Sequence, residues 1–120
     1  MSLIEELGPL TDAMTAWRHD IHQHPETAYE ENRTADLVAE ALTSFGIEID
    51  RGLGETGVVG TLRKGKANRA IGLRADMDAL NLRELNDFDY RSVHDGKMHA
   101  CGHDGHTAML LGAAQYLARE

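Results

Sequence analysis

Ten residues near the end of the 120-residue chain, from Met98 to Thr107, hold one thiol, three imidazoles and one carboxylate. Cys101 is the only cysteine, so within the chain it is a metal ligand, a nucleophile or an inert buried thiol. With His103 it forms a Cys-x-His pair, whose thiolate and imidazole suit zinc, cobalt or manganese. The glycines at 102 and 105 let the backbone fold tightly around an ion. This segment favours a metal site, which needs further ligands from elsewhere.

Two aspartates stand upstream, where the apolar run from Ile71 to Leu73 passes into polar residues. Because side chains alternate along a strand, Asp76 and Asp78 are expected to point to the same side. Such a pair binds a cation directly, accepts the N–H of an imidazole ligand and tunes its basicity, or lies solvated at a strand end. The cluster around Cys101 favours a role at the metal.

Four other histidines have simpler interpretations. His22 and His24 flank a predicted turn before Pro25, where we expect them to bond backbone groups freed at the end of a helix. His94 and His99 lie in a polar loop, and the sequence predicts that both face solvent. None of these four is expected to bind the metal.

Two further residues of the cluster have open roles. His106 is a metal ligand, a hydrogen-bond donor to a ligand, or the first residue of the last helix. Asp104 either reaches a cation or caps that helix. Outside the cluster, Trp17 and Tyr116 fall at helical spacing, which predicts core packing.

Apolar periodicity predicts an α/β domain. Steps of three and four predict a first helix that stops before Pro25 and buries Ile4, Leu7, Leu10, Met14, Trp17 and Ile21. A second helix, closed by Gly46, buries Leu37, Val38, Ala41, Leu42 and Phe45. Alternating or β-branched runs predict strands at Ile47–Asp50, Gly57–Arg63 and Ala70–Asp76. A last helix is expected from Thr107, and its pattern still runs at Glu120.

Charge and composition narrow the class of protein. Twelve basic and twenty acidic side chains give a net charge of -8, which argues against nucleic-acid and anionic-membrane partners. No apolar run approaches the roughly 18 residues of a membrane span, and Glu5 and Glu6 stand where a signal peptide is basic. We therefore expect one cytoplasmic domain at most.

Three motifs occur in one order: Arg18–Glu26, Gly72–Leu80 and Met98–Ala108. Together they resemble the N-terminal part of the amidohydrolase and metallopeptidase family that contains hippurate hydrolase, N-acyl-amino-acid amidohydrolases and the plant auxin-conjugate hydrolases. The resemblance covers nearly the whole chain. One departure is Asn81, where the family usually has a proline that stiffens the loop leaving the strand.

The resemblance implies a fold and a site. Residues 1–120 would be the N-terminal portion of a zinc-exopeptidase-like catalytic domain, a mixed sheet flanked by helices, without the rest of that domain and without the dimerisation domain. Cys101 and His103 would be metal ligands, and Asp78 would orient and polarise the site. The site would take two divalent ions of manganese, zinc, nickel or cobalt, in a parent protein that is a homodimer or larger.

The implied reaction is hydrolysis of the amide bond of an N-acyl amino acid, such as a hippurate-like compound, or of a peptide. Metal ions would activate water, and a glutamate would take its proton. That glutamate and further ligands are expected beyond Glu120, so the 120-residue chain is predicted to be inactive alone. The alternative is a non-catalytic metal-binding or interaction module that retains this half of the fold. A third interpretation of the site is that Cys101 acts as a nucleophile.

Overall fold

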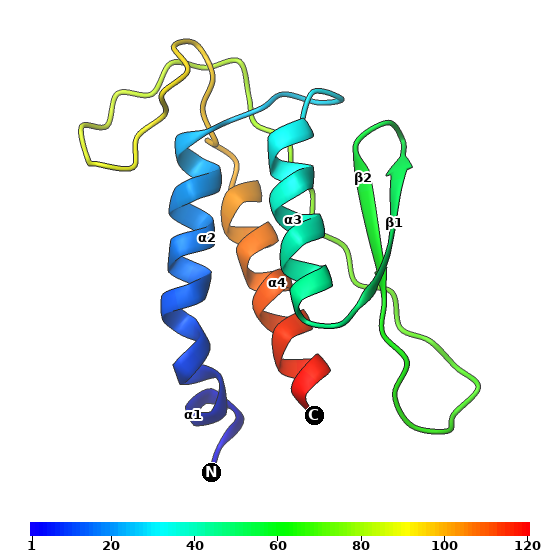
Figure 1. Ribbon diagram of the computed structural model, residues 1–120. Helices are drawn as coiled ribbons and strands as arrows, with labels where there is room; N and C mark the ends of the chain where they lie inside the picture. The colour runs from blue at the N-terminus through cyan, green and yellow to red at the C-terminus, as the bar shows by residue number, and fades with distance from the viewer.

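The computed structural model describes all residues from Met1 to Glu120. Its helices are α1 (Leu3–Leu7), α2 (Thr11–Gln23), α3 (Asn32–Ser44) and α4 (His103–Arg119), with a 3₁₀ turn at Gly8–Leu10 and a hairpin of β1 (Glu48–Leu53) and β2 (Gly57–Thr61). The three long helices lie side by side, and the hairpin lies beyond α3 (Figure 1). Since α2 runs opposite to α3 and α4, its C-terminal end lies with their N-terminal ends (Figure 1).

The first predicted helix is interrupted. Pro9 lacks an N–H and stands in the 3₁₀ turn between α1 and α2, so the chain changes direction there. As a result Ile4 is 83% exposed, contrary to the predicted stripe, whereas Leu10 and Ile21 are buried. The helix ends at Gln23, before Pro25, as predicted.

The second helix and the hairpin follow the sequence closely. Gly46 has a φ of 81°, which only glycine adopts at little cost, and the Ile47 amide donates to the Leu42 carbonyl over 3.1 Å. This motif ends α3 and leads the chain into β1. The two strands pair antiparallel, with Glu48 opposite Thr61 and an irregularity between Arg51 and Leu53.

The core lies between α3, α4 and the hairpin. Its buried centre comprises Val38, Ala41, Leu42, Ile47 and Leu111. Trp17 packs against this cluster from α2 and meets Phe45 edge-on at 5.9 Å between ring centroids, in agreement with its predicted core role. Tyr116 instead is half-buried at the rim. Its hydroxyl donates to Glu6 over 2.6 Å, and this bond raises the pKa of Tyr116 to about 12.

The third predicted strand, Ala70–Asp76, does not form, and this prediction was wrong. Strands exist only as hydrogen-bonded neighbours, and no other segment of residues 1–120 pairs with this one. Ile71 is accordingly 89% exposed. The α/β class is confirmed, but the sheet in these residues is the antiparallel pair β1–β2 rather than a mixed sheet. None of the helices is both long and apolar enough to cross a membrane.

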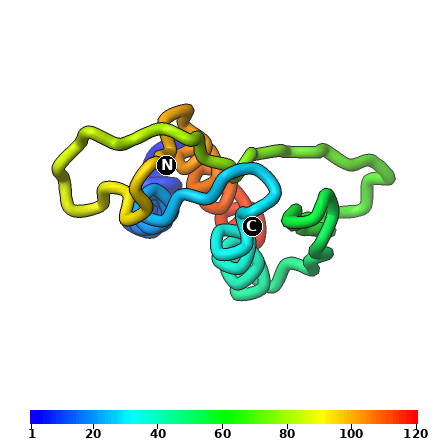
Figure 2. The backbone as a smooth tube through the Cα atoms, turned by 90° about the horizontal axis from the view of Figure 1, so that it is seen from above, coloured from blue at the N-terminus to red at the C-terminus, as the bar shows by residue number.

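The long connection from β2 to α4 passes over the helix ends (Figures 1 and 2). It crosses back on itself where Leu80 and Met98 exchange backbone hydrogen bonds of 3.0 Å each. A further bond of 2.8 Å joins the Ala79 amide to the Glu26 carbonyl. These bonds hold residues 76–80 next to the first turn of α4.

Candidate metal centre

Three ligand-type side chains converge at the N-terminal end of α4. The ligand atoms of Asp76, Asp78 and His103 all lie within 4.8 Å of one another. The two carboxylates share a side, as alternation predicts, although the segment is not part of a sheet. The Thr107 hydroxyl donates to the Asp76 carbonyl over 3.0 Å and fixes this segment against α4.

The ring of His103 is oriented by Asp78. Its Nδ1 lies 2.9 Å from the Asp78 carbonyl oxygen and 2.9 Å from Oδ1 of the same residue, so Nδ1 carries the proton that is donated there. The other nitrogen, Nε2, is left with its lone pair and lies 4.0 Å from Asp76 Oδ2. Metal-binding histidines are held in this way by an oxygen acceptor on the second nitrogen.

Asp76 is kept ionised. Its Oδ1 accepts a hydrogen bond of 2.8 Å from Arg74 Nε, and this bond, aided by the positive charge of Arg74, lowers the pKa of the carboxyl. Oδ2 faces His103 and is free of Arg74. The side chain therefore presents a negative oxygen where a cation would also meet His103 Nε2.

Cys101 lies on the turn that begins α4. Gly102 has a φ of 104°, a left-handed conformation that suits glycine, and the helix begins directly after it. The predicted start at Thr107 was therefore too late. The Cys101 thiol is exposed and is not one of the three converging groups. Its assignment as a ligand stays a prediction.

His106 and Asp104 both lie inside the first turns of α4. His106 is exposed, with its ring 5.9 Å from that of His103 between centroids, and it does not open the helix. Asp104 makes no cap bond. It is buried and receives a 2.8 Å hydrogen bond from His22 Nδ1, with Arg18 Nε 3.4 Å away. The capping role expected for Asp104 is therefore not filled, and its reach to a cation stays a prediction.

The donor set fits a divalent cation. Two carboxylates and an imidazole with a free Nε2 are ligands that manganese, zinc and cobalt accept, and the neighbouring thiol would favour zinc or cobalt. The site is open to solvent on one side, since Asp76, Asp78 and His103 are only half-buried.

No pattern in the sequence marks Glu84 as part of a buried cluster. This carboxylate accepts a 2.8 Å hydrogen bond from His22 Nε2, and both side chains are almost fully buried. His22 is thus structural, as predicted, but its partners are two carboxylates rather than freed backbone groups. His24 matches the prediction, because its Nδ1 bonds the Asp20 carbonyl over 2.8 Å.

His99 does not face solvent, and that prediction was wrong. The backbone pairing of Met98 with Leu80 draws the next residue inward, and His99 is 4% exposed. Neither ring nitrogen has a hydrogen-bond partner, and burial lowers the pKa of the imidazole, so the ring is neutral at pH 7. His94 is exposed, as predicted.

Protonation of Glu84 makes the free energy of unfolding depend on pH in the acid range. Burial raises the pKa of its carboxyl, but hydrogen bonds from His22, Asn86 and the Ser92 amide outweigh it, and the net pKa is below the ordinary 4.5. The unfolded chain therefore takes up this proton at a higher pH than the folded one. The stabilisation is complete above pH 4.5 and is lost as the pH falls through the folded pKa. We expect Glu84→Gln to flatten the acid limb of unfolding free energy against pH, measured by urea denaturation.

Glu26 joins α3 to the segment that carries the aspartates. Its carboxylate accepts hydrogen bonds from the amides of Arg33 and Thr34 and from the Thr34 hydroxyl, at 2.9, 2.7 and 2.7 Å. It acts as the N-terminal cap that α3 lacks at Glu31. We expect Glu26→Ala to reduce the free energy of unfolding by about 2 kcal/mol in denaturant titrations. An unchanged midpoint would contradict this capping role, and Glu30→Ala, on the exposed turn nearby, is the control.

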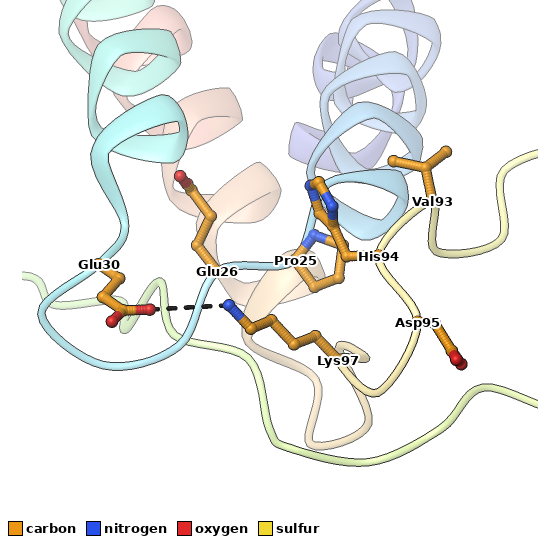
Figure 3. Close-up of a pocket in the computed structure, with 7 residues that line it drawn as sticks. All are labelled: Pro25, Glu26, Glu30, Val93, His94, Asp95 and Lys97. Carbon is orange, nitrogen blue, oxygen red and sulfur yellow. Dashed lines mark ion pairs between the residues drawn. The ribbon is translucent and has the colours of Figure 1, made fainter.

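A hollow of about 510 Å³ lies beside Glu26 and Glu30, in the connection between α2 and α3 (Figure 3). Its lining is mostly polar, and Lys97 and Glu30 face each other across it at 3.6 Å. The lining residues are Pro25, Glu26, Glu30, Val93, His94, Asp95 and Lys97. None of the three converging ligands borders it, so the metal centre and this hollow are separate.

The sequence is similar to those of known hydrolases. The model of peptidase family M20/M25/M40 matches residues 72–120, which include both aspartates and the start of α4. Hippurate hydrolase of Campylobacter jejuni is 51% identical over the whole chain, which covers 31% of that protein. N-acyl-L-amino acid amidohydrolase of Geobacillus stearothermophilus is 45% identical over 96% of the chain and 32% of that protein.

A solved structure has the same fold. A dinuclear metal binding peptidase from the M20 family of Bacillus subtilis superimposes with a TM-score of 0.88 at 36% identity, over 92% of this chain and 31% of that one. The chain thus spans about a third of the length of each of these proteins.

Proposed function

Since the chain belongs to peptidase family M20/M25/M40, we propose that it is part of a metal-dependent amidohydrolase that cleaves the amide bond of N-acyl amino acids. The observation that carries the proposal is the convergence of Asp76, Asp78 and His103, with Nδ1 of His103 held by Asp78. Hippurate-like compounds are the substrates we favour, and small peptides are the alternative within the same reaction.

Each residue has a distinct role in this proposal. His103 would bind a cation through Nε2, and Cys101, on the turn that precedes α4, would be a second ligand. Asp78 orients the His103 ring and makes its Nε2 a stronger donor. Asp76 supplies a negative oxygen that either contacts a cation or balances its charge.

The metal would polarise the amide carbonyl and make bound water acidic enough to attack it. Residues 1–120 contribute by holding charged side chains in position at the site. Asp76 and Asp78 would provide negative charge to hold a cation, and Thr107 keeps the Asp76 segment from moving away from α4. Because Arg74 already holds one oxygen of Asp76, only the other is available to the site.

In the whole protein, we propose, residues 1–120 form the N-terminal portion of the catalytic domain of a cytoplasmic homodimer or larger assembly. Two divalent ions occupy the complete site, in line with the dinuclear relative, and manganese, zinc, nickel and cobalt are the candidates.

Hydrolysis of hippurate by the full-length protein tests the proposal. We expect activity that disappears after treatment with a chelator and dialysis, and that returns on addition of Mn²⁺, Co²⁺ or Zn²⁺. Activity that persists in chelator but is lost on alkylation of Cys101 would support a thiol nucleophile instead. Stoichiometric metal without hydrolysis of any N-acyl amino acid or peptide would favour a non-catalytic metal-binding module.

A further inference from the structure

His22 lies outside the three converging ligands and connects the first turn of α4, which carries His103, to the loop that carries Glu84. Its Nδ1 bonds Asp104 and its Nε2 bonds Glu84, each over 2.8 Å, and all three side chains are at most 5% exposed. A carboxylate only accepts hydrogen bonds, so both bonds form when both ring nitrogens carry a proton. Arg18, 3.4 Å from Asp104, gives the cluster a second positive group against its two carboxylates.

Packing fixes the His22 ring in this position. The rings of Phe88 and Tyr90 meet it edge-on, with centroids at 5.7 and 5.8 Å. Tyr90 in turn stacks between Phe88, at 4.0 Å, and His19, at 3.7 Å. The loop that carries Glu84 is therefore attached to α2 by stacked rings as well as by hydrogen bonds.

The other end of this connection is the first turn of α4. Asp104 directly follows His103, and within a helix the position of one side chain fixes the rotation of its neighbour about the helix axis. A buried charge cluster adds little net stability compared with apolar packing, but it fixes a single arrangement, because any other leaves a charge unpaired.

We propose that His22 is a positioning residue for the metal centre: by holding Asp104 and Glu84 it sets the orientation of the α4 turn that carries Cys101 and His103. The inference rests on the proposed function, because it concerns the geometry of that metal site. His22 makes hydrogen bonds to Asp104 and Glu84 but to none of Asp76, Asp78 and His103, so its effect passes through Asp104.

Cobalt binding to the full-length protein tests the inference. Visible absorption follows Co²⁺ titrated into the metal-free wild type, into His22→Gln and into the matched control His24→Gln, two residues further along the chain. We expect His22→Gln to bind Co²⁺ about 10- to 100-fold more weakly and to show shifted bands at saturation. His24→Gln, whose ring bonds the Asp20 carbonyl and lies 3.7 Å from the Asp20 carboxylate, keeps the wild-type affinity and spectrum, because both contacts stay within α2 and its C-terminal end.

The Co²⁺ titration distinguishes a positioning role of His22 from a purely structural one. A folded His22→Gln with the wild-type spectrum and affinity, and only a lower melting temperature, overturns the inference in favour of a purely structural role. If His22→Gln does not fold, Glu84→Gln takes its place, since it keeps the shape and removes one charge. A shifted spectrum then supports positioning, and an unchanged one overturns it. Wild-type protein that binds no Co²⁺ would refute the proposed function itself, a result distinct from both.

Discussion

His103→Ala in the full-length protein is expected to abolish amide hydrolysis. The substitution removes Nε2, the one ring nitrogen that Asp78 leaves free for a cation. A bound metal supplies several kcal/mol of charge stabilisation, and about 1.4 kcal/mol is a tenfold change in rate, so kcat should fall by roughly 1,000-fold or more. Steady-state kinetics on hippurate, together with the metal content of the purified variant, measure this effect.

The control for this experiment is His94→Ala. His94 is exposed on the loop, lies outside the group of converging ligands, and should be replaceable with little change in kcat or metal content. If His103→Ala keeps its metal and more than about a tenth of the wild-type kcat, His103 is not a ligand and the site has been assigned wrongly.

Asp78→Ala is expected to cost about 10- to 100-fold in metal affinity or kcat. The alanine removes Oδ1, one of the two oxygens that face Nδ1 of His103, while the backbone carbonyl of residue 78 stays in place. The ring then keeps its proton position but loses part of the negative charge that strengthens Nε2 as a donor. Metal titration and kinetics of the same variant separate affinity from turnover.

Asp78→Asn separates charge from shape. Its amide oxygen still accepts the hydrogen bond from Nδ1, so we expect an intermediate loss, smaller than that of Asp78→Ala. Equal losses in the two variants would mean that the charge of Asp78, rather than its hydrogen bond, matters. No loss in either would leave the backbone carbonyl as the sole orienting group for His103.

Local chemistry explains what could be predicted from the sequence. Helix α3 and the hairpin depend on apolar periodicity and on Gly46, whose positive φ needs a glycine, and both lie within a few residues of their signals. The shared side of Asp76 and Asp78 follows from alternation alone. The start of α4 had a local signal too, because Gly102 directly precedes an acidic first turn. In the sequence, however, the glycines at 102 and 105 indicated a loop around an ion rather than the start of a helix.

Tertiary pairing explains what could not be predicted. His22 meets Asp104 and Glu84 over separations of 82 and 62 residues, and no local pattern marks such partners. His99 is buried because the segments around Leu80 and Met98 pair with each other. The polar residues of its loop had instead predicted an exposed side chain. The strand expected at Ala70–Asp76 has the composition of a strand but no neighbour to pair with in residues 1–120.

The most direct test of the metal centre is the metal content of the full-length protein, purified without chelator and analysed by mass spectrometry of the elements. We expect about two divalent ions per wild-type chain and a clear loss in His103→Ala. A well-folded wild-type protein without stoichiometric metal, or a His103→Ala variant with the full complement, would contradict it.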